Sequence, residues 1–356
     1  MDVAVLGAAG DVGRAICAEL IERRVLGAHS RLQLVGRAGG LSARAVHGLR
    51  VDLIDAHDEH APIIDVALRP EDVVADVVVM AAGRTIPTAA GSGVDRDALA
   101  STNLPIFDEY AAALAEYGSG HEVVIVVTNP VELGVAAMSR RLNRHRVIGM
   151  GAWLDTLRFR REIAWSLGIR RQRVSGFVAG QHGEGVVPLW STVRLRGLDS
   201  DDRAAFVRRL RGDRDLNIFS EEIAAARAAI SRMAGDDITD AFDYVDGLPP
   251  GIRTIVRPFL THQSGAKTAF GTARATVELV DTVLDGREIV VAGQVALEGE
   301  ISLGGQPFTG VLGVPIVVGP DGWTRVLLDD LAPDEDAYLG EVAARIGAFT
   351  DRWMLE

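Results

Sequence analysis

Cysteine and lysine are nearly absent from this chain of 356 residues. The single cysteine, Cys17, excludes an internal disulfide bond and any metal site built from several cysteines, and it is typical of a protein from a reducing compartment. Of the 37 basic residues only Lys267 is a lysine, and the others are arginines. Because lysine is otherwise absent from the sequence, the position of Lys267 in the fold is of particular interest.

A long apolar run and a positive net charge are missing as well. The chain starts MDVAVLGAAG, which predicts a strand and a turn rather than a secretion signal or a membrane anchor. We therefore expect a cytoplasmic protein. The net charge of −12 disfavours nucleic acid and anionic membranes as partners, because the field of the whole molecule repels both. An anionic small molecule would have to be bound by local arginines.

Short, continuous apolar segments recur through the first part of the chain and predict strands that are buried on both faces. They lie at 3–6, 32–35, 63–66, 77–81, 123–127 and 147–148. Helical patterns separate them, for example at 11–24, 95–117 and 131–143. This alternation predicts an α/β fold, with a Rossmann-type, doubly wound parallel sheet in residues 1–149.

The remaining residues, 150–356, predict a second, α+β domain that binds the substrate, since 356 residues exceed the usual size of one core. We expect a helix at 153–168, a strand at 173–179, a long helical region at 201–234, paired strands between 288 and 318, and a final helix at 333–354. The segment 236–251 is rich in Asp, Gly and Pro and predicts a loop.

A glycine-rich turn follows the first predicted strand. In Gly7-Ala8-Ala9-Gly10-Asp11-Val12-Gly13 the glycines permit a tight turn and a close approach of the backbone to a pyrophosphate at the helix N-terminus. The acidic residue expected after the second strand, where it would bind the ribose, is missing, because Gly36 and Arg37 stand there. We therefore expect NAD or NADP as cofactor, with NADP slightly favoured. The alternative is that Arg37 only stacks on adenine and the cofactor is NAD.

A second group of residues supplies a carboxylate, a guanidinium and an imidazole. Asp155 and Arg158 lie one helical turn apart in a predicted helix, and His182 follows in Gly180-Gln181-His182-Gly183-Glu184-Gly185. An imidazole oriented by an aspartate can pass a proton near neutral pH, and a guanidinium binds a carboxylate through two parallel hydrogen bonds. These groups suit the interconversion of a 2-hydroxy acid and a 2-oxo acid, with His182 and Asp155 as the catalytic pair and Arg158 binding the substrate.

The chain resembles the lactate/malate dehydrogenase family over nearly its whole length. The likeness rests on the malate-type turn at Gly7, on Val127-Thr128-Asn129-Pro130-Val131, on Asp155 and Arg158, on His182 with its neighbours, and on Arg96 followed by Asn103. The resemblance implies an NAD(P)-dependent 2-hydroxy acid dehydrogenase, most simply for malate and oxaloacetate, that forms a homodimer or homotetramer.

The resemblance also implies residue roles. Asn129 would contact substrate and nicotinamide, Arg96 would polarise the substrate carbonyl, and the loop 83–95 would close over the site. The residues expected to bind the cofactor are Gly7, Gly10, Asp11, Val12, Gly13, Gly36, Arg37, Ala82, Gly83, Asn103, Thr128 and Asn129. A surface role for Arg96, paired with nearby aspartates, is the alternative.

The predicted loop departs from the malate enzymes. Where they carry an arginine that binds the second carboxylate of the substrate, this chain has Ala90. Lys267, in Gly265-Ala266-Lys267-Thr268-Ala269, could supply the missing charge to the substrate, or it could be a solvated lysine at a helix start. A lactate-like or otherwise anionic 2-oxo acid therefore remains open as the substrate.

Two other function classes fit less well. A catalytically idle scaffold would be expected to lack the proton donor, and His182, Asp155 and both arginines are present. An NAD-dependent glycoside hydrolase would need Cys and His metal ligands, and Cys17 has no such partner in the sequence. The other histidines have no spacing typical of a metal site, so no metal is expected.

Overall fold

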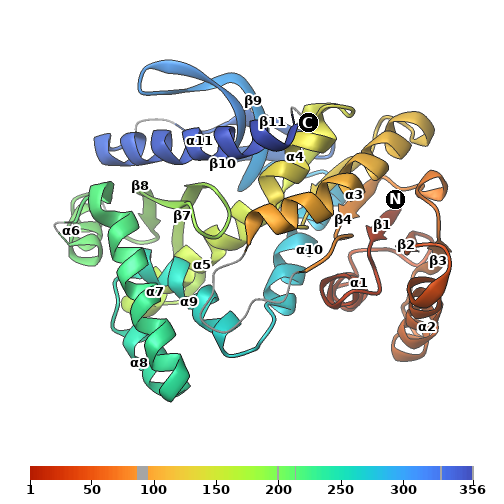
Figure 1. The fold of residues 1–356 in the computed structure, drawn as a ribbon, viewed down its shortest axis with the longest axis horizontal. Coiled ribbons are helices and arrows are strands. Elements are labelled where there is room, and N and C mark those ends of the chain that lie inside the picture. Colours follow the sequence, from red (N-terminus) through yellow and green to blue (C-terminus); the bar gives the residue numbers. More distant parts are fainter. Residues whose placement is uncertain (86–94, 199, 213, 329–330, 355–356) are drawn as a thin grey trace.

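One mixed sheet runs through the computed structural model, which describes residues 1–85, 95–198, 200–212, 214–328 and 331–354. Along its main path the strand order is β3-β2-β1-β4-β5-β6-β9-β10-β7-β8, and β11 pairs with β10. The first six strands in this order come from the first part of the chain, and the others come from the second. Figure 1 shows β1 to β4 on one side of the molecule and β7 and β8 on the other.

The first part is the predicted parallel sheet. It consists of β1 (Val3–Leu6), β2 (Arg31–Val35), β3 (Ile63–Ala67), β4 (Val77–Met80), β5 (Val123–Val126) and β6 (Val147–Gly149). Neighbouring strands pair in parallel in the order 3-2-1-4-5-6. This is the doubly wound order of dinucleotide-binding folds, so the predicted Rossmann-type sheet is confirmed.

Helices cover both faces of this sheet and explain its continuous apolar strands. Val3 and Val5 belong to the apolar cluster formed with α1 (Asp11–Glu22), α2 (Gly40–Ala56) and α10 (Ala269–Asp285). Ala4 and Leu6 belong to the opposite cluster, formed with α3 (Arg96–Tyr117) and α4 (Val131–Ser139). Successive side chains of a strand point to opposite faces, so a sheet covered on both sides needs apolar residues at every position.

The second part is built around α5 (Gly151–Ser166). Its antiparallel strands are β7 (Val174–Gly180), β8 (Val186–Leu195), β9 (Ile289–Leu303), β10 (Gln306–Gly319) and β11 (Gly322–Val326), and α11 (Pro333–Met354) ends the chain. The paired strands and the final helix lie where the sequence predicts them. β6 pairs with β9, so the sheet continues past residue 149, and the domain boundary placed there stays a prediction.

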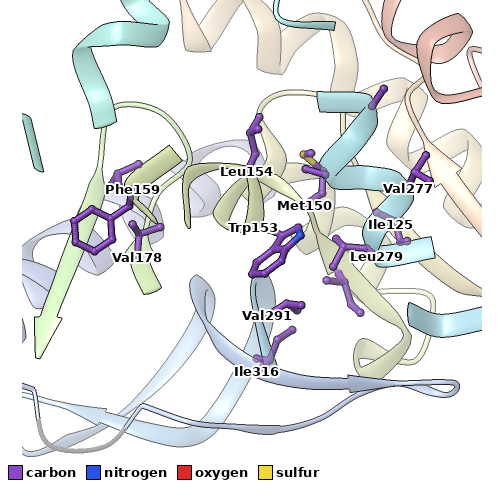
Figure 2. Close-up of a cluster of buried hydrophobic side chains, with 14 of the residues drawn as sticks. Ile125, Met150, Trp153, Leu154, Phe159, Val178, Val277, Leu279, Val291 and Ile316 are labelled. Atoms are coloured by element: carbon purple, nitrogen blue, oxygen red, sulfur yellow. The ribbon is translucent and has the colours of Figure 1, made fainter. Parts of the chain in front are cut away.

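Apolar side chains at the start of α5 join the two parts. Trp153 lies between Met150 and Val291 of β9, in a buried cluster that also contains Leu154 and Ile125 of β5 (Figure 2). Trp153 also donates a hydrogen bond through Nε1 to Glu278 of α10 over 3.2 Å. This packing fixes α5, and with it the side chains on its other face, against the parallel sheet.

One prediction for the second part is wrong. The helical region expected at 201–234 is present as α6 (Ser200–Arg211) and α7 (Phe219–Asp236), but the segment 236–251, expected to be a loop, contains α8 (Ile238–Asp246) and the start of α9 (Pro250–Gln263). Asp237 accepts a hydrogen bond from the Thr239 N–H and Pro250 is the first residue of α9. The Asp and Pro residues that resemble a loop are therefore helix-start signals.

Short 3-10 turns complete the described elements, at Pro70–Asp72, Arg144–Arg146, Arg171–Arg173 and Leu216–Ile218. None of the helices within the described ranges has the length and apolar character that crossing a membrane requires.

Candidate active site

The glycine turn between β1 and α1 leaves no room for larger side chains. Gly7 has φ +78°, and a Cβ there would lie 2.7 Å from the Ala81 carbonyl oxygen. A Cβ on Gly13 would lie 2.3 Å from the Gly7 carbonyl oxygen. Gly10 is the N-cap residue of α1 and has no side chain to accept a hydrogen bond. The first backbone N–H groups of the helix therefore receive no side-chain cap from it. These features fit a turn that binds the pyrophosphate of a dinucleotide.

The end of β2 explains why no acidic residue follows it. A Cβ on Gly36 would lie 2.6 Å from Cγ2 of Val46 in α2, so that any side chain there would clash with the helix. The next residue, Arg37, is exposed and donates its backbone N–H to the Ser42 hydroxyl over 3.0 Å. The arginine is the first side chain past the strand that could reach a ribose or its phosphate.

Asn103 and Thr128 organise the ends of β4 and β5. The amide of Asn103 accepts from the Arg84 N–H at 2.7 Å and donates to the carbonyl oxygens of Arg84, at 3.1 Å, and Asn129, at 2.8 Å. Thr128 donates to the Ala82 carbonyl at 2.9 Å, and its methyl group would clash with a Cβ on Gly83. The predicted cofactor residues Ala82, Gly83, Asn103, Thr128 and Asn129 thus lie together, and Asn103 is buried and holds the backbone rather than facing solvent.

His182 and Asp155 form the predicted pair. His182 follows β7, and its Nδ1 lies 2.7 Å from Oδ2 of Asp155 in α5. A carboxylate only accepts hydrogen bonds, so Nδ1 carries the proton and Nε2 is the nitrogen that can exchange one with a substrate. Gly151 permits this approach, because a Cβ there would lie 2.5 Å from Cγ of the imidazole. The glycine one turn before the aspartate is visible in the sequence. That it makes room for the imidazole becomes clear only when the position of the histidine loop is known.

The environment keeps Asp155 ionised. Burial alone would raise its pKa, but the charge and hydrogen bond of His182, the charge of Arg158 and the Gly183 N–H together lower the pKa below its ordinary value. Arg158 donates from Nη1 to Oδ1 of Asp155 at 2.9 Å, and burial lowers the pKa of its guanidinium. The carboxylate therefore holds the imidazole on one oxygen and the guanidinium on the other.

Arg96 lies at the first position of α3 rather than on a loop, and it pairs with a residue that the sequence analysis did not identify. Its Nη2 donates to Oε2 of Glu132 at 2.9 Å, and the Arg96 Nε is buried without a hydrogen-bond partner among the described residues. Glu132 is completely buried, and its Oε1 accepts the His182 backbone N–H at 2.7 Å. Glu132 thus joins Arg96 to the histidine loop. Residues 86–94 of the expected loop, Ala90 among them, lie outside the described residues.

A cavity of about 500 Å³ opens beside Arg158, and its lining carries positive charge without any acidic side chain. The cationic residues that line it are Arg158, Arg161, Arg171, Arg257, Lys267 and Arg274. The Lys267 side chain is 72% exposed, and its ammonium is paired with Asp11 of the glycine turn. Lys267 therefore borders the cavity while its charge lies on the nucleotide side.

His262 is a second histidine near the pair that the sequence analysis did not select. It lies near the end of α9, and its pKa is lowered by burial and by the positive charges of Arg158 and His182. In the sequence it stands in a polar stretch with no spacing signal, because only the packing of α9 beside α5 brings it close to Arg158. Within the described ranges no group of His, Cys, Asp and Glu is placed to hold a metal ion.

Sequence comparisons show which known proteins this chain is similar to. Residues 1–149 match the family model of the lactate/malate dehydrogenase NAD-binding domain. A malate dehydrogenase from Halobacterium salinarum is 29% identical over 364 residues, covering 98% of each chain. An L-2-hydroxycarboxylate dehydrogenase (NAD(P)(+)) from Methanocaldococcus jannaschii is 26% identical and covers 94% of this chain and 93% of its own.

Solved structures share the fold over nearly the full length. A lactate dehydrogenase from Cryptosporidium parvum, crystallised with lactic acid and its dinucleotide cofactor, has a TM-score of 0.74 at 22% identity and covers 99% of this chain and 97% of its own. The malate dehydrogenase from Aeropyrum pernix has a TM-score of 0.73 at 21% identity, with 99% and 98% covered. Residues 1–149 thus match the NAD-binding domain of the lactate/malate dehydrogenase family, and nearly the whole chain is similar to malate dehydrogenases.

Proposed function

We propose that this protein interconverts a 2-hydroxy acid and the matching 2-oxo acid with NAD(H) or NADP(H), and that malate and oxaloacetate or a related anionic acid are its substrates. The observation that carries the proposal is the contact of 2.7 Å between His182 and the buried Asp155, with Arg158 bound to the other carboxylate oxygen. Asp155 and Arg158 lie on α5, and His182 reaches the same carboxylate from the loop after β7, which supports a proton donor beside an anion-binding group.

Reduction of a 2-oxo acid needs a hydride at the carbonyl carbon and a proton at its oxygen. The nicotinamide ring, when bound, supplies the hydride. His182 gives the proton from Nε2, and Asp155 keeps the imidazolium oriented and compensates its charge. In the reverse direction the same nitrogen takes the proton from the hydroxyl group.

Arginines on both sides of His182 would position the substrate. Arg158 has donors besides the one engaged with Asp155, and these are available to a substrate carboxylate. Glu132 connects Arg96 to the histidine loop. A substrate carbonyl oxygen would give an acceptor to the buried Arg96 Nε, which has no hydrogen-bond partner among the described residues. We propose that Asn129, at the end of β5, contacts the substrate and the nicotinamide.

The cavity beside Arg158 supports an acid with a second anionic group. Its described lining residues include five arginines and no carboxylate, and the acids that pair with four of these arginines lie outside the lining. A second anionic group of the substrate would be attracted by these arginines, whereas the methyl group of pyruvate would gain nothing from them. We therefore favour a dicarboxylic 2-oxo acid over pyruvate.

For the cofactor we propose that NADP(H) is accepted beside NAD(H). A side chain at position 36 would clash with Val46, so this position carries no carboxylate that could repel a 2′-phosphate. The next residue is the basic Arg37. The M. jannaschii relative is named as an NAD(P)(+) enzyme. The alternative remains that Arg37 stacks on adenine and NAD(H) is preferred.

A panel of 2-oxo acids, run with NADH and with NADPH at the nicotinamide absorbance band, tests these proposals. We expect kcat/KM to be highest for oxaloacetate or another dicarboxylic acid and to be measurable with both cofactors. Equal or better turnover of pyruvate would contradict the choice of substrate, and a strong NADH preference would contradict the NADP proposal.

The idle scaffold is the second candidate, and the same panel separates the two functions when His182→Asn is added. An enzyme loses turnover in this variant and keeps its affinity for NADH. A binding protein turns over none of the acids, in either form of the chain.

A further inference from the structure

The only lysine of the chain ties the substrate side of the fold to the phosphate turn. Lys267 lies two residues before α10, and its ammonium pairs with the carboxylate of Asp11, the first residue of α1. Both side chains are largely exposed, at 72% and 58%. Exposed ion pairs add little to stability, so this pair is not required to hold α1 and α10 together.

Asp11 is an unusual neighbour for a bound pyrophosphate. As the first residue of α1 it follows the glycines that approach the phosphates, and its carboxylate has the same sign of charge as they have. Its pKa is lowered by the hydrogen bond and the charge of Lys267, so the carboxylate is ionised at neutral pH. Without a cation beside it, Asp11 would repel the cofactor.

Lys267 is suited to change partners. Its stem has four methylene groups, its ammonium is exposed, and the group it now binds stands at the position where the pyrophosphate is expected. Buried apolar side chains of the two helices, among them Leu20 of α1 and Val277 of α10, belong to one cluster, so that α10 stays in place when Lys267 moves. A second ion pair, between Arg274 and Glu19 at 3.1 Å, also joins these helices.

We propose that Lys267 serves the cofactor rather than the substrate: it neutralises Asp11 in the free protein and binds the pyrophosphate of the dinucleotide in the complex. This inference rests on the proposed nicotinamide-dependent function. The proposal predicts that substitutions of Lys267 and Asp11 change the affinity for the dinucleotide in opposite directions. Loss of the lysine removes a phosphate ligand and leaves Asp11 uncompensated, whereas loss of the carboxylate removes a repulsion and frees the lysine.

Direct titration of NADH fluorescence with Lys267→Met, Asp11→Asn and Glu19→Gln tests the proposal without turnover. We expect Lys267→Met to raise the Kd for NADH about fivefold or more and to reduce its dependence on salt. Asp11→Asn should lower the Kd about twofold or more, by the same electrostatic argument. ADP-ribose, which keeps the pyrophosphate, should show the same pattern.

Glu19→Gln is the matched control, because it also neutralises an acid of α1 that pairs with a base of α10. Glu19 lies about two turns after Asp11 in α1, or about 12 Å along the helix axis, and this distance exceeds a Debye length at physiological salt. Its Kd for NADH should stay within about twofold of the unmodified protein. Thermal unfolding of each variant checks that the fold is intact, and Lys267→Arg should retain most of the affinity.

Two results would overturn the proposal. If Lys267→Met and Asp11→Asn weaken NADH binding equally, the pair is a structural tie between α1 and the start of α10. If Lys267→Met leaves the Kd for NADH unchanged and lowers the preference for oxaloacetate over pyruvate, the lysine serves the substrate. A protein that binds NADH but reduces no 2-oxo acid would contradict the proposed function and still permit this comparison of affinities.

Discussion

The two parts of the molecule build their sites in different ways. In residues 1–149 the strands are apolar on both faces, and the predicted cofactor site is made of glycines, backbone groups and the buried amide of Asn103. After residue 149 more charged side chains are buried, among them Asp155, Glu162, Arg253 and Glu335, whereas in the first part Glu132 is buried and pairs with Arg96. The predicted cofactor site thus depends on close approach of the backbone, and the second part depends on pairing of charges.

This difference has a physical consequence. A backbone site is damaged by added volume, because a new Cβ displaces the turn itself. A site of buried charges is damaged by the loss of one partner, because the remaining charge stays desolvated and unpaired. The following variants sharpen the contrast, from the largest expected effect to the smallest.

His182→Asn should lower kcat by about 10²–10⁴, the contribution typical of a positioned acid or base. The affinity for NADH should be unchanged, since the glycine turn is not altered. Steady-state rates with the best 2-oxo acid and fluorescence titration of NADH measure the two effects. Turnover within a factor of about ten of the unmodified protein would show that another group supplies the proton.

Glu162→Gln should destabilise the fold by about 3–5 kcal/mol, the usual cost of removing one partner from a buried ion pair. Glu162 accepts from Arg253 at 2.9 Å and from Arg257 at 3.0 Å, and Arg253 is only 5% exposed, so the guanidinium would remain buried without its partner. Denaturant unfolding measures the loss. Asp321→Asn, which breaks the exposed pair with Arg146, is the control and should cost less than about 1 kcal/mol.

The same carboxylate makes stability depend on pH. Burial alone would raise the pKa of Glu162, but the hydrogen bonds and charges of Arg161 and Arg257 lower it below its ordinary value. The pair therefore contributes fully above the unfolded pKa of about 4.3, and the contribution is lost as the pH falls through the lower, folded pKa. Glu162→Gln should flatten this acid limb of the stability profile. An unchanged limb would mean that other carboxylates, such as Asp155, dominate it.

Gly13→Ala should cost about 1–3 kcal/mol and weaken NADH binding, because its Cβ would lie 2.3 Å from the Gly7 carbonyl oxygen. Gly48→Ala, inside α2, is the matched control. A Cβ there meets no atom within 4 Å, so the change should be neutral or stabilise the helix by about 0.5–1 kcal/mol. Equal effects of the two substitutions would contradict a steric role for the turn.

Cys17 should show no measurable reaction with iodoacetamide in the folded protein. It is completely buried in α1, and burial raises the pKa of its thiol to about 12, so that almost no thiolate is present at pH 8. Mass spectrometry before and after denaturation measures the modification. Rapid labelling of the folded protein would mean that α1 opens readily, and the apolar part would then be the less stable of the two.

The parallel sheet could be predicted from the sequence because its signal is local. Each strand from Val3–Leu6 to Val123–Val126 is a short apolar segment next to a helical pattern, and such segments have few alternative structures. The helices at Ile238–Asp246 and Pro250–Gln263 were missed because Asp, Gly and Pro occur both in loops and at helix starts. Only the apolar side chains beneath them, such as Val245, decide between the two.

The site could be predicted in part for the same reason. Asp155 and Arg158 share a helix, so their spacing is visible in the sequence, and the contact of His182 with Asp155 lies where the motifs predict it. Glu132 and His262 were not identified, because each lies far along the chain from its partners and has no spacing of its own. That Lys267 binds substrate stays a prediction. The ion pair of Lys267 with Asp11 is the observation that supports a role toward the cofactor instead.

The sequence by itself determined the class of fold, the glycine turn and the types of the reacting groups, because these depend on residues close to one another along the chain. Only the tertiary structure decided which charges pair, Arg96 with Glu132 and Lys267 with Asp11. It also decided that α9 lines the cavity beside Arg158. Ion pairs and cavities join segments that are distant in sequence, and their energy depends on burial and on separation, which exist only after the sheet and helices have packed.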